Sequence, residues 1–170
     1  GMVLQEPFLY SRTIKENIAA SVPEATFEEI RQAAKVACID EAIMNFPDGY
    51  ETLVGERGVT LSGGQRQRIA IARMLLQKAP VMIFDDSLSA VDSQTDSKIR
   101  KALLENRRDA TVILISHRVT TLMSADKIMV LNQGRIEEMG THQELIKQQG
   151  IYRKIYDIQM SQDDRMQMEV

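Results

Sequence analysis

Two adjacent acidic residues follow a short apolar run, where Val81 to Phe84 lead directly into Asp85 and Asp86. Such a run is typical of a strand buried on both faces of a parallel sheet, and open α/β sheets bind ligands at the carboxyl ends of their strands. We therefore predict that Asp85 holds Mg²⁺, directly or through water, because Mg²⁺ prefers oxygen ligands. Asp86 would then face the terminal phosphate of a nucleotide. The alternative is a strand that simply ends in polar residues.

A second candidate site is the segment Leu61 to Gln65, which has the sequence Leu-Ser-Gly-Gly-Gln. Ser62 and Gln65 have the spacing of a capping box at the start of a helix. A capping box alone does not account for Gly63 and Gly64, which lower the stability of a first helical turn. Paired glycines let a ligand approach the backbone closely, and N–H groups at a helix N-terminus bind anions. The segment therefore favours a phosphate site.

The third candidate is His117, which follows the apolar run Thr111 to Ser116. An isolated histidine is most often structural. Here a helical pattern, about Ser93 to Asn106, separates this run from the one that ends at Asp85, and strand–helix–strand order predicts a parallel sheet. Because both side chains would then emerge at the same sheet edge, His117 is a candidate site residue.

The elements around these sites are predicted from caps, turns and apolar spacing. Further capping boxes predict helices beginning at Thr13, Thr26 and Thr141, the last one ending near Gly150. The helix from Thr26 has an apolar face of Ile30, Ala33, Ala34, Ala37 and Cys38. A strand ends in residues 1–5, a turn lies at 46–50, a hairpin turns at 132–134, and a last helix from residue 151 runs into a polar tail.

Composition bounds the class of protein. The 170 residues, with 44% hydrophobic and 26% charged side chains, fit one globular domain of ordinary size. A net charge of -3 gives no electrostatic argument for nucleic acid binding. No apolar run approaches the length of about 18 residues that a membrane helix needs. Cys38 is the only cysteine, so no intrachain disulfide forms, and we expect it to pack in a helix core.

Taken together, the motifs resemble the nucleotide-binding domain of an ATP-binding cassette (ABC) transporter of the exporter type, from its Q-loop to its C-terminus. The resemblance covers nearly all of the chain, in the family's order. Gln5 stands in a segment like the Q-loop, 61–65 is the signature motif, 81–85 resembles the Walker B strand, 89–92 the D-loop, and His117 the switch histidine. Residues 51–58 resemble the X-loop of exporters, with Glu56 at its acidic position.

The resemblance implies ATP and Mg²⁺ as cofactors and a head-to-tail pair of such domains. Each ATP would lie between the phosphate loop of one domain and the signature of the other, so residues 61–65 would serve the partner's ATP. Gln5 would sense Mg²⁺ and the attacking water, and its loop would touch a transmembrane domain. His117 would bond the terminal phosphate, and Asp92 would cross the domain interface. The cycle would power export from the cytoplasmic face of the cell membrane.

The implied fold is α/β, the core of a P-loop NTPase (RecA-like) without its N-terminal strands and phosphate loop, plus an α-helical signature subdomain. We expect the core strand and Q-loop in residues 1–12, the helical subdomain in 13–76, the α/β core with Walker B, D-loop and H-loop in 77–160, and the polar tail in 161–170. The phosphate-loop pattern needs Gly-Lys, and none of the nine glycines precedes a lysine. We therefore expect no detectable ATPase activity from these 170 residues alone.

The family's general base is usually Glu where this chain has Asp86. The shorter carboxylate predicts a degenerate site, because a misplacement of about 1 Å can cost about a hundredfold in rate. An intact signature beside a degenerate site suggests one half of a heterodimeric exporter. The competing interpretation is a homodimer in which Asp86 works adequately.

Two other classes of function stay open. Signature-bearing ATPases that act on DNA carry long coiled-coil insertions, whereas only 56 residues separate Gln5 from Ser62 here. Signature-bearing ATPases that act on ribosomes lack the patterns that this chain has at residues 6–18 and 54–58. A truncated, non-catalytic domain that pairs with an intact cassette is the remaining alternative.

Overall fold

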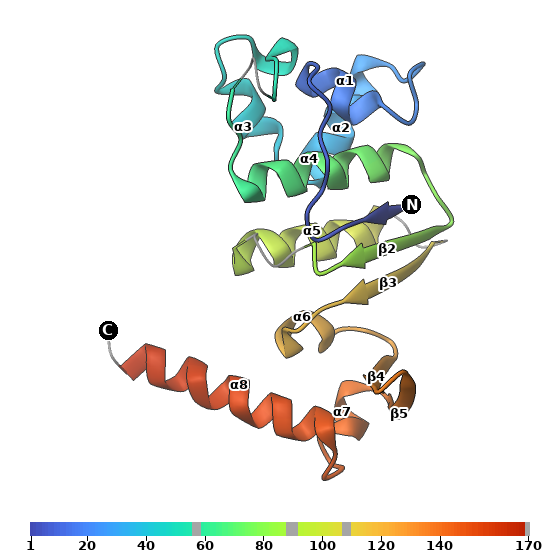
Figure 1. The fold of residues 1–170 in the computed structure, drawn as a ribbon, viewed down its shortest axis with the longest axis vertical. Helices are drawn as coiled ribbons and strands as arrows, with labels where there is room; N and C mark the ends of the chain where they lie inside the picture. Colours follow the sequence, from blue (N-terminus) through green and yellow to red (C-terminus); the bar gives the residue numbers. More distant parts are fainter. Residues whose placement is uncertain (56–58, 88–91, 107–109, 169–170) are drawn as a thin grey trace. The chain divides into compact units, whose positions relative to one another are not determined.

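The computed structural model describes residues 1–55, 59–87, 92–106 and 110–168. The chain divides into two compact units, Gly1–Ile115 and Ser116–Val170, and each is described by itself (Figure 1). The positions of the motifs in the sequence predict finer boundaries after residues 12, 76 and 160, and these boundaries stay a prediction. Within the described residues, none of the helices is both long and apolar enough to cross a membrane.

The first unit begins with strand β1 and a group of helices. The elements are β1 (Met2–Val3), α1 (Ile14–Ala19), α2 (Phe27–Val36), α3 (Asp40–Met44), the 3₁₀ turn η1 (Gly49–Glu51) and α4 (Gly63–Leu76). The predicted capping boxes at Thr13, Thr26 and Ser62 are all present, with both reciprocal hydrogen bonds in each. Local sequence therefore sets where α1, α2 and α4 begin.

A three-stranded parallel sheet completes this unit. It contains β1, β2 (Val81–Asp85) and β3 (Thr111–Ile115) in that order, and α5 (Ser93–Asn106) connects β2 to β3. Val81 pairs with Thr111 and Asp85 with Ile115, which confirms the parallel pairing predicted from the two apolar runs. The predicted strand end in residues 1–5 is β1, which pairs in parallel with β2.

Helix α4 lies between the sheet and the helices α1 and α2, with contacts to β1 on one side and to both helices on the other (Figure 1). Ile69, Ala72 and Leu76, which recur at helical spacing along α4, are all buried. The same core contains Met82 and Phe84 of β2 and Ile99 of α5, together with most of the predicted apolar face of α2. A single apolar core therefore fixes the signature helix against the sheet.

Cys38 differs from its prediction. Helix α2 ends at Val36 with Ala37 as its C-cap, so Cys38 lies beyond the helix, with a left-handed φ of 54°. The thiol is half-buried against the core cluster, and burial raises its pKa. Cys38 thus packs against the core from a turn, and the helix predicted to hold it is shorter than its apolar spacing indicates.

The second unit contains α6 (Val119–Leu122), the hairpin strands β4 (Ile128–Asn132) and β5 (Arg135–Gly140), α7 (His142–Leu145) and α8 (Ile151–Met168). The hairpin is antiparallel, as predicted. Gln133 and Gly134 both have positive φ, as a two-residue hairpin turn requires. Val119, Ile128, Leu145 and Tyr152 form its small core.

The helix predicted from Thr141 has its capping box but ends at Leu145, well before Gly150. The turn that follows is held from both sides. Arg153 donates to the carbonyl of Ile146 at 2.8 Å, and the Glu138 carboxylate accepts the N–H groups of Ile151 and Tyr152. These bonds start α8 as a separate helix, and α8 continues to Met168 through most of the expected tail.

Candidate nucleotide-binding site

Three predicted site residues share one edge of the parallel sheet. Val3 pairs with Phe84, so Gln5 and Asp86 each lie two residues beyond a paired position, and Asp85 is the last residue of β2. Parallel strands end at the same sheet edge, which therefore gathers an amide and two carboxylates. These oxygen donors are of the type that Mg²⁺ prefers.

The backbone at Asp86 turns sharply out of the strand. Its φ is 43°, in the left-handed region, and its N–H donates to the carbonyl of Ile115 at 2.8 Å. Asp tolerates this conformation better than longer side chains do. The next residue, Ser87, is fully buried, and its hydroxyl oxygen has no hydrogen-bond partner among the described residues. The hydrogen bond to Ile115 therefore fixes where the Asp86 side chain leaves the sheet.

The signature segment forms the start of α4, a helix of 14 residues. Ser62 Oγ accepts the N–H of Gln65 at 3.2 Å, and Gln65 Oε1 accepts the N–H of Ser62 at 2.9 Å. Leu61 is buried and anchors the segment in the core, whereas Ser62 and Gly63 are exposed. The capping box uses neither of the glycine N–H groups, and these lie at the positive end of the helix dipole. Such a helix start can bind a phosphate group.

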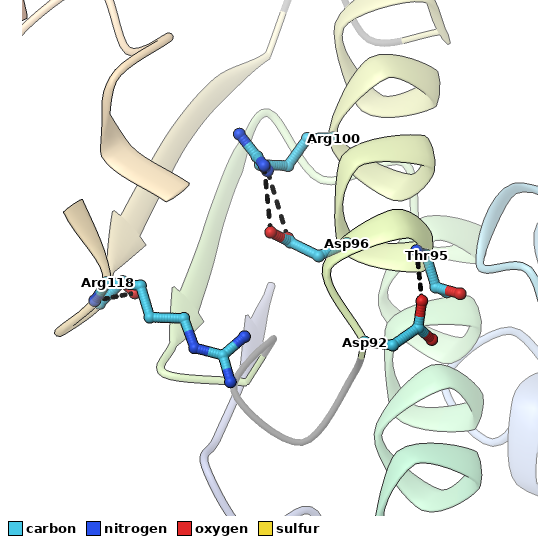
Figure 2. Close-up of polar contacts among 6 residues, drawn as sticks. Asp92, Thr95, Asp96, Arg100 and Arg118 are labelled. Atoms are coloured by element: carbon cyan, nitrogen blue, oxygen red, sulfur yellow. Dashed lines mark hydrogen bonds and ion pairs between the residues drawn. The ribbon is translucent and has the colours of Figure 1, made fainter. Parts of the chain in front are cut away.

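Asp92 directly precedes α5 and caps it. Its carboxylate accepts the N–H of Thr95 at 2.9 Å, and this bond lowers the pKa of Asp92 (Figure 2). One turn further on, buried Asp96 forms a two-bond ion pair with Arg100. The rest of the predicted D-loop, 89–91, and Glu56 of the predicted X-loop lie outside the described residues.

His117 belongs to the second unit, two residues beyond Ile115. Its carbonyl accepts a hydrogen bond from Gln159 Nε2 at 2.7 Å, and the next residue, Arg118, donates its N–H to Ser116 Oγ at 3.1 Å (Figure 2). These bonds tie the turn after β3 to its own unit. The predicted proximity of the His117 side chain to Asp85 stays a prediction. Among the described residues, no three His, Cys, Asp or Glu side chains gather as a metal-binding group.

Sequence reasoning missed Gln67, which connects the signature helix to the predicted Q-loop. The Gln67 side chain is buried on α4, and its Nε2 donates to the carbonyl of Gln5 at 3.0 Å. Its Oε1 has no hydrogen-bond partner among the described residues. The signal was present in the sequence, because Gln67 is one turn before Ile71 on the apolar face of α4.

A second missed group, Asn17 and Arg73, holds the chain just after the Q-loop. Asn17 is fully buried on α1; its amide donates to the carbonyls of Tyr10 and Thr13 and accepts the N–H of Tyr10. Arg73 of α4 donates to Asn17 Oδ1, to the Asn17 carbonyl at 2.7 Å and to the Phe8 carbonyl at 3.0 Å. Burial lowers the pKa of Arg73. Two helices therefore grip this backbone while the rings of Phe8 and Tyr10 remain exposed.

The fold, with its parallel sheet and connecting helices, is that of the P-loop NTPase class. Comparison with known proteins gives the family, since the model described as "ABC transporter" matches residues 1–89. The chain belongs to the ABC transporter family.

Several similar relatives are bacterial proteins. The chain is 50% identical over 159 residues to the uncharacterized ABC transporter ATP-binding protein YknU of Bacillus subtilis. This alignment covers 94% of this chain and 27% of YknU. It is equally similar to YgaD of the same organism, named a putative multidrug export ATP-binding/permease protein. The solved structure of a bacterial Atm1-family ABC exporter with ATP bound matches with a TM-score of 0.89 and 40% identity, over 94% of this chain and 28% of that one. The chain thus spans little more than a quarter of the length of these relatives.

Proposed function

We propose that this chain is the ATP-binding and hydrolysing part of an ABC exporter, with ATP and Mg²⁺ as cofactors. The observation that carries the proposal is the shared sheet edge, where Gln5, Asp85 and Asp86 leave two paired parallel strands. The intact signature at the start of α4 supports it. The relatives named as exporters, and the ATP-bound exporter of similar fold, agree with this function.

The residues present fit magnesium–ATP by their donor chemistry. Asp85 and the Gln5 side chain offer the oxygen ligands that Mg²⁺ takes in nucleotide sites, where it also binds phosphates and water. The bound nucleotide supplies a phosphoanhydride bond whose hydrolysis releases free energy. Asp86 accepts a proton from water or orients it, and His117 donates a hydrogen bond to the terminal phosphate. The N–H groups of Gly63 and Gly64 bind phosphate oxygens of the ATP held by the partner domain.

The proposed partners are a second nucleotide-binding domain, paired head to tail, and the transmembrane domain of the exporter. Asp92 lies at the domain interface, and the exposed segment after Gln5 faces the transmembrane domain. The assembly works at the cytoplasmic face of the cell membrane. Nucleic acid has no part in the proposed cycle. We propose that the chain divides by these roles into residues 1–12, 13–76, 77–160 and 161–170.

Two capping-box variants test the role of the signature in the assembled, full-length protein. Ser62→Ala and Thr26→Ala each remove an N-cap with the same reciprocal bonds, at a cost of about 1 kcal/mol of stability. We expect Ser62→Ala to lower ATP hydrolysis strongly and Thr26→Ala to leave it near the wild-type rate. Equal rates in the two variants would contradict the proposed role of the signature, because only the helix start at Ser62 is placed against ATP.

We further propose that Asp86 makes this chain's own site degenerate and that the exporter is a heterodimer. The support is the length of the side chain, because Asp places its carboxylate about 1 Å short of where Glu would, and such a shift can cost about a hundredfold in rate. The test is ATP hydrolysis by the full-length chain, alone and with its partner, before and after Asp86→Glu. If the Glu variant is no faster, the degenerate-site proposal is wrong and the homodimer is favoured.

A non-catalytic role is the second candidate, supported by the signature helix start at Ser62, which would serve only the ATP of a partner. In that case the chain would pair with an intact cassette and contribute only its signature. ATP-dependent co-elution with an intact cassette, together with unchanged hydrolysis in Asp86→Ala, would favour this role over the catalytic one.

A further inference from the structure

Gln67 connects two parts of the chain that the proposed function assigns to different ATP molecules. It lies on α4, whose first residues would bind the partner's ATP, and it donates to the backbone of Gln5, which would bind Mg²⁺ at this chain's own site. In Figure 1 the segment after β1 passes α4 on its way to α1. The hydrogen bond of 3.0 Å lies within that crossing.

Fold stability alone gives little reason for a glutamine at this position. The side chain is 3% exposed; its Nε2 donates to the carbonyl of Gln5, while its buried Oε1 has no hydrogen-bond partner among the described residues. A buried acceptor without a partner costs at least as much as one neutral hydrogen bond contributes. An apolar side chain of similar length would fill the same space without this cost. The clearest effect of the amide is therefore its hydrogen bond to the backbone of Gln5.

The effect of the bond falls on the backbone of Gln5 and leaves its side chain available. Gln5 follows the two-residue strand β1, so sheet pairing ends before it, and its own side chain is exposed. Arg73 provides the next anchor from α4, at the carbonyl of Phe8. Between Val3 and Phe8, the carbonyl of Gln5 is thus held by Gln67, and the direction of the Gln5 side chain depends on that bond.

We propose that Gln67 is a positioning residue for Gln5: its amide orients the Q-loop backbone so that the Gln5 side chain reaches the divalent cation of this chain's own nucleotide. This inference rests on the proposed function and adds a residue to it. Because Gln67 moves with α4, the same bond makes cation binding at one site depend on the position of the helix that serves the other site.

The test is divalent-cation affinity in the assembled full-length protein, measured by electron paramagnetic resonance of Mn²⁺ with a non-hydrolysable ATP analogue. Gln67→Met keeps the length of the side chain and removes the donor. We expect its Mn²⁺ affinity to fall about tenfold, the usual size of the effect when a residue that orients a metal ligand is changed. In hydrolysis assays, the half-saturating Mg²⁺ concentration should rise by a similar factor, with kcat at saturating Mg²⁺ much less changed.

Tyr50→Phe is the matched control, because it removes a buried neutral donor from the same unit, the 2.7 Å bond to Asp40, without touching the Q-loop. We expect its Mn²⁺ affinity to stay at the wild-type value even where its thermal stability falls as far as that of Gln67→Met. Equal losses of affinity in the two variants would reduce the role of Gln67 to fold stability and overturn the inference.

Gln5→Ala separates failure of the inference from failure of the proposed function. If Gln5→Ala weakens Mn²⁺ binding and Gln67→Met does not, the positioning role is wrong and the proposed function stands. If neither variant weakens binding, the assignment of Gln5 to the cation is wrong, and the inference falls with it. Weakening in both, without an effect of Tyr50→Phe, supports the inference.

Discussion

Replacing Asn17 by alanine should destabilise the first unit more than any exposed asparagine change. The Asn17 amide makes four hydrogen bonds of 3.0 Å or shorter, to both backbone groups of Tyr10, to the Thr13 carbonyl and to Arg73 Nη2. Alanine would remove all four and leave their part-buried partner atoms without these bonds.

The size of the effect follows from these bonds. At about 0.5–1.5 kcal/mol each, four bonds correspond to about 2–6 kcal/mol. Tyr10 is 45% exposed, so water can replace part of the loss at its backbone groups. We therefore expect the free energy of unfolding to fall by about 3 kcal/mol, which lowers the Tm of a domain of this size by about 6–12 °C.

Urea unfolding of the 170-residue chain, followed by circular dichroism, measures this change, with Asn45→Ala as the control. Asn45 is exposed just after α3, and its replacement should change stability by no more than about 0.5 kcal/mol. If Asn17→Ala costs less than about 1 kcal/mol, the network does not hold the segment after the Q-loop. The same result would also show that the chain after Gln5 is not held firmly against α4.

Three further outcomes are expected. Burial and the hydrogen bond to Asp40 raise the pKa of Tyr50. The contribution of Tyr50 to stability is therefore complete below about pH 10, the usual pKa of tyrosine, and is lost as the pH rises toward the folded-state pKa. Urea unfolding between about pH 9 and 11 should show a steeper decline in the free energy of unfolding than in Tyr50→Phe. The isolated 170 residues should show no ATPase activity in a phosphate-release assay, and magnesium-dependent turnover lost in Asp85→Ala would refute this. Exposed Ile113 and Ile115 on the edge strand β3 should make the chain self-associate, whereas light scattering from a monodisperse monomer at high concentration would contradict it.

Local signals in the sequence predicted most of the fold. The four capping boxes depend on residues three apart, so their helix starts at Thr13, Thr26, Ser62 and Thr141 could be placed from spacing alone. The apolar runs predicted β2 and β3 and their parallel pairing. The expected burial on both faces is wrong for β3, because Ile113 and Ile115 on one of its faces are exposed. The hairpin at 132–134 followed from its glycine.

Features that depend on tertiary contacts were predicted less well. Helix α7 ends at Leu145, and the turn after it is held by Glu138 of β5 and Arg153 of α8, which lie outside the three-residue spacing of a capping box. The apolar-face position of Gln67 could be read from the sequence, but its partner could not, since Gln5 is 62 residues away. The placement of Asp85 and Gln5 at one sheet edge agrees with the order of the motifs, while the chemical roles of the site residues remain predictions.

The pairing of β1 with β2 also has a consequence for the order in which the molecule folds. Met2 and Val3 find their partners only at Ile83 and Phe84, and contacts between residues so distant in sequence form slowly because a long loop must close first. During synthesis on the ribosome, α1 and α2 can form local structure before β2, the partner of β1, has been made. We therefore expect the edge that carries Gln5 to assemble late, after the signature helix has already found its place.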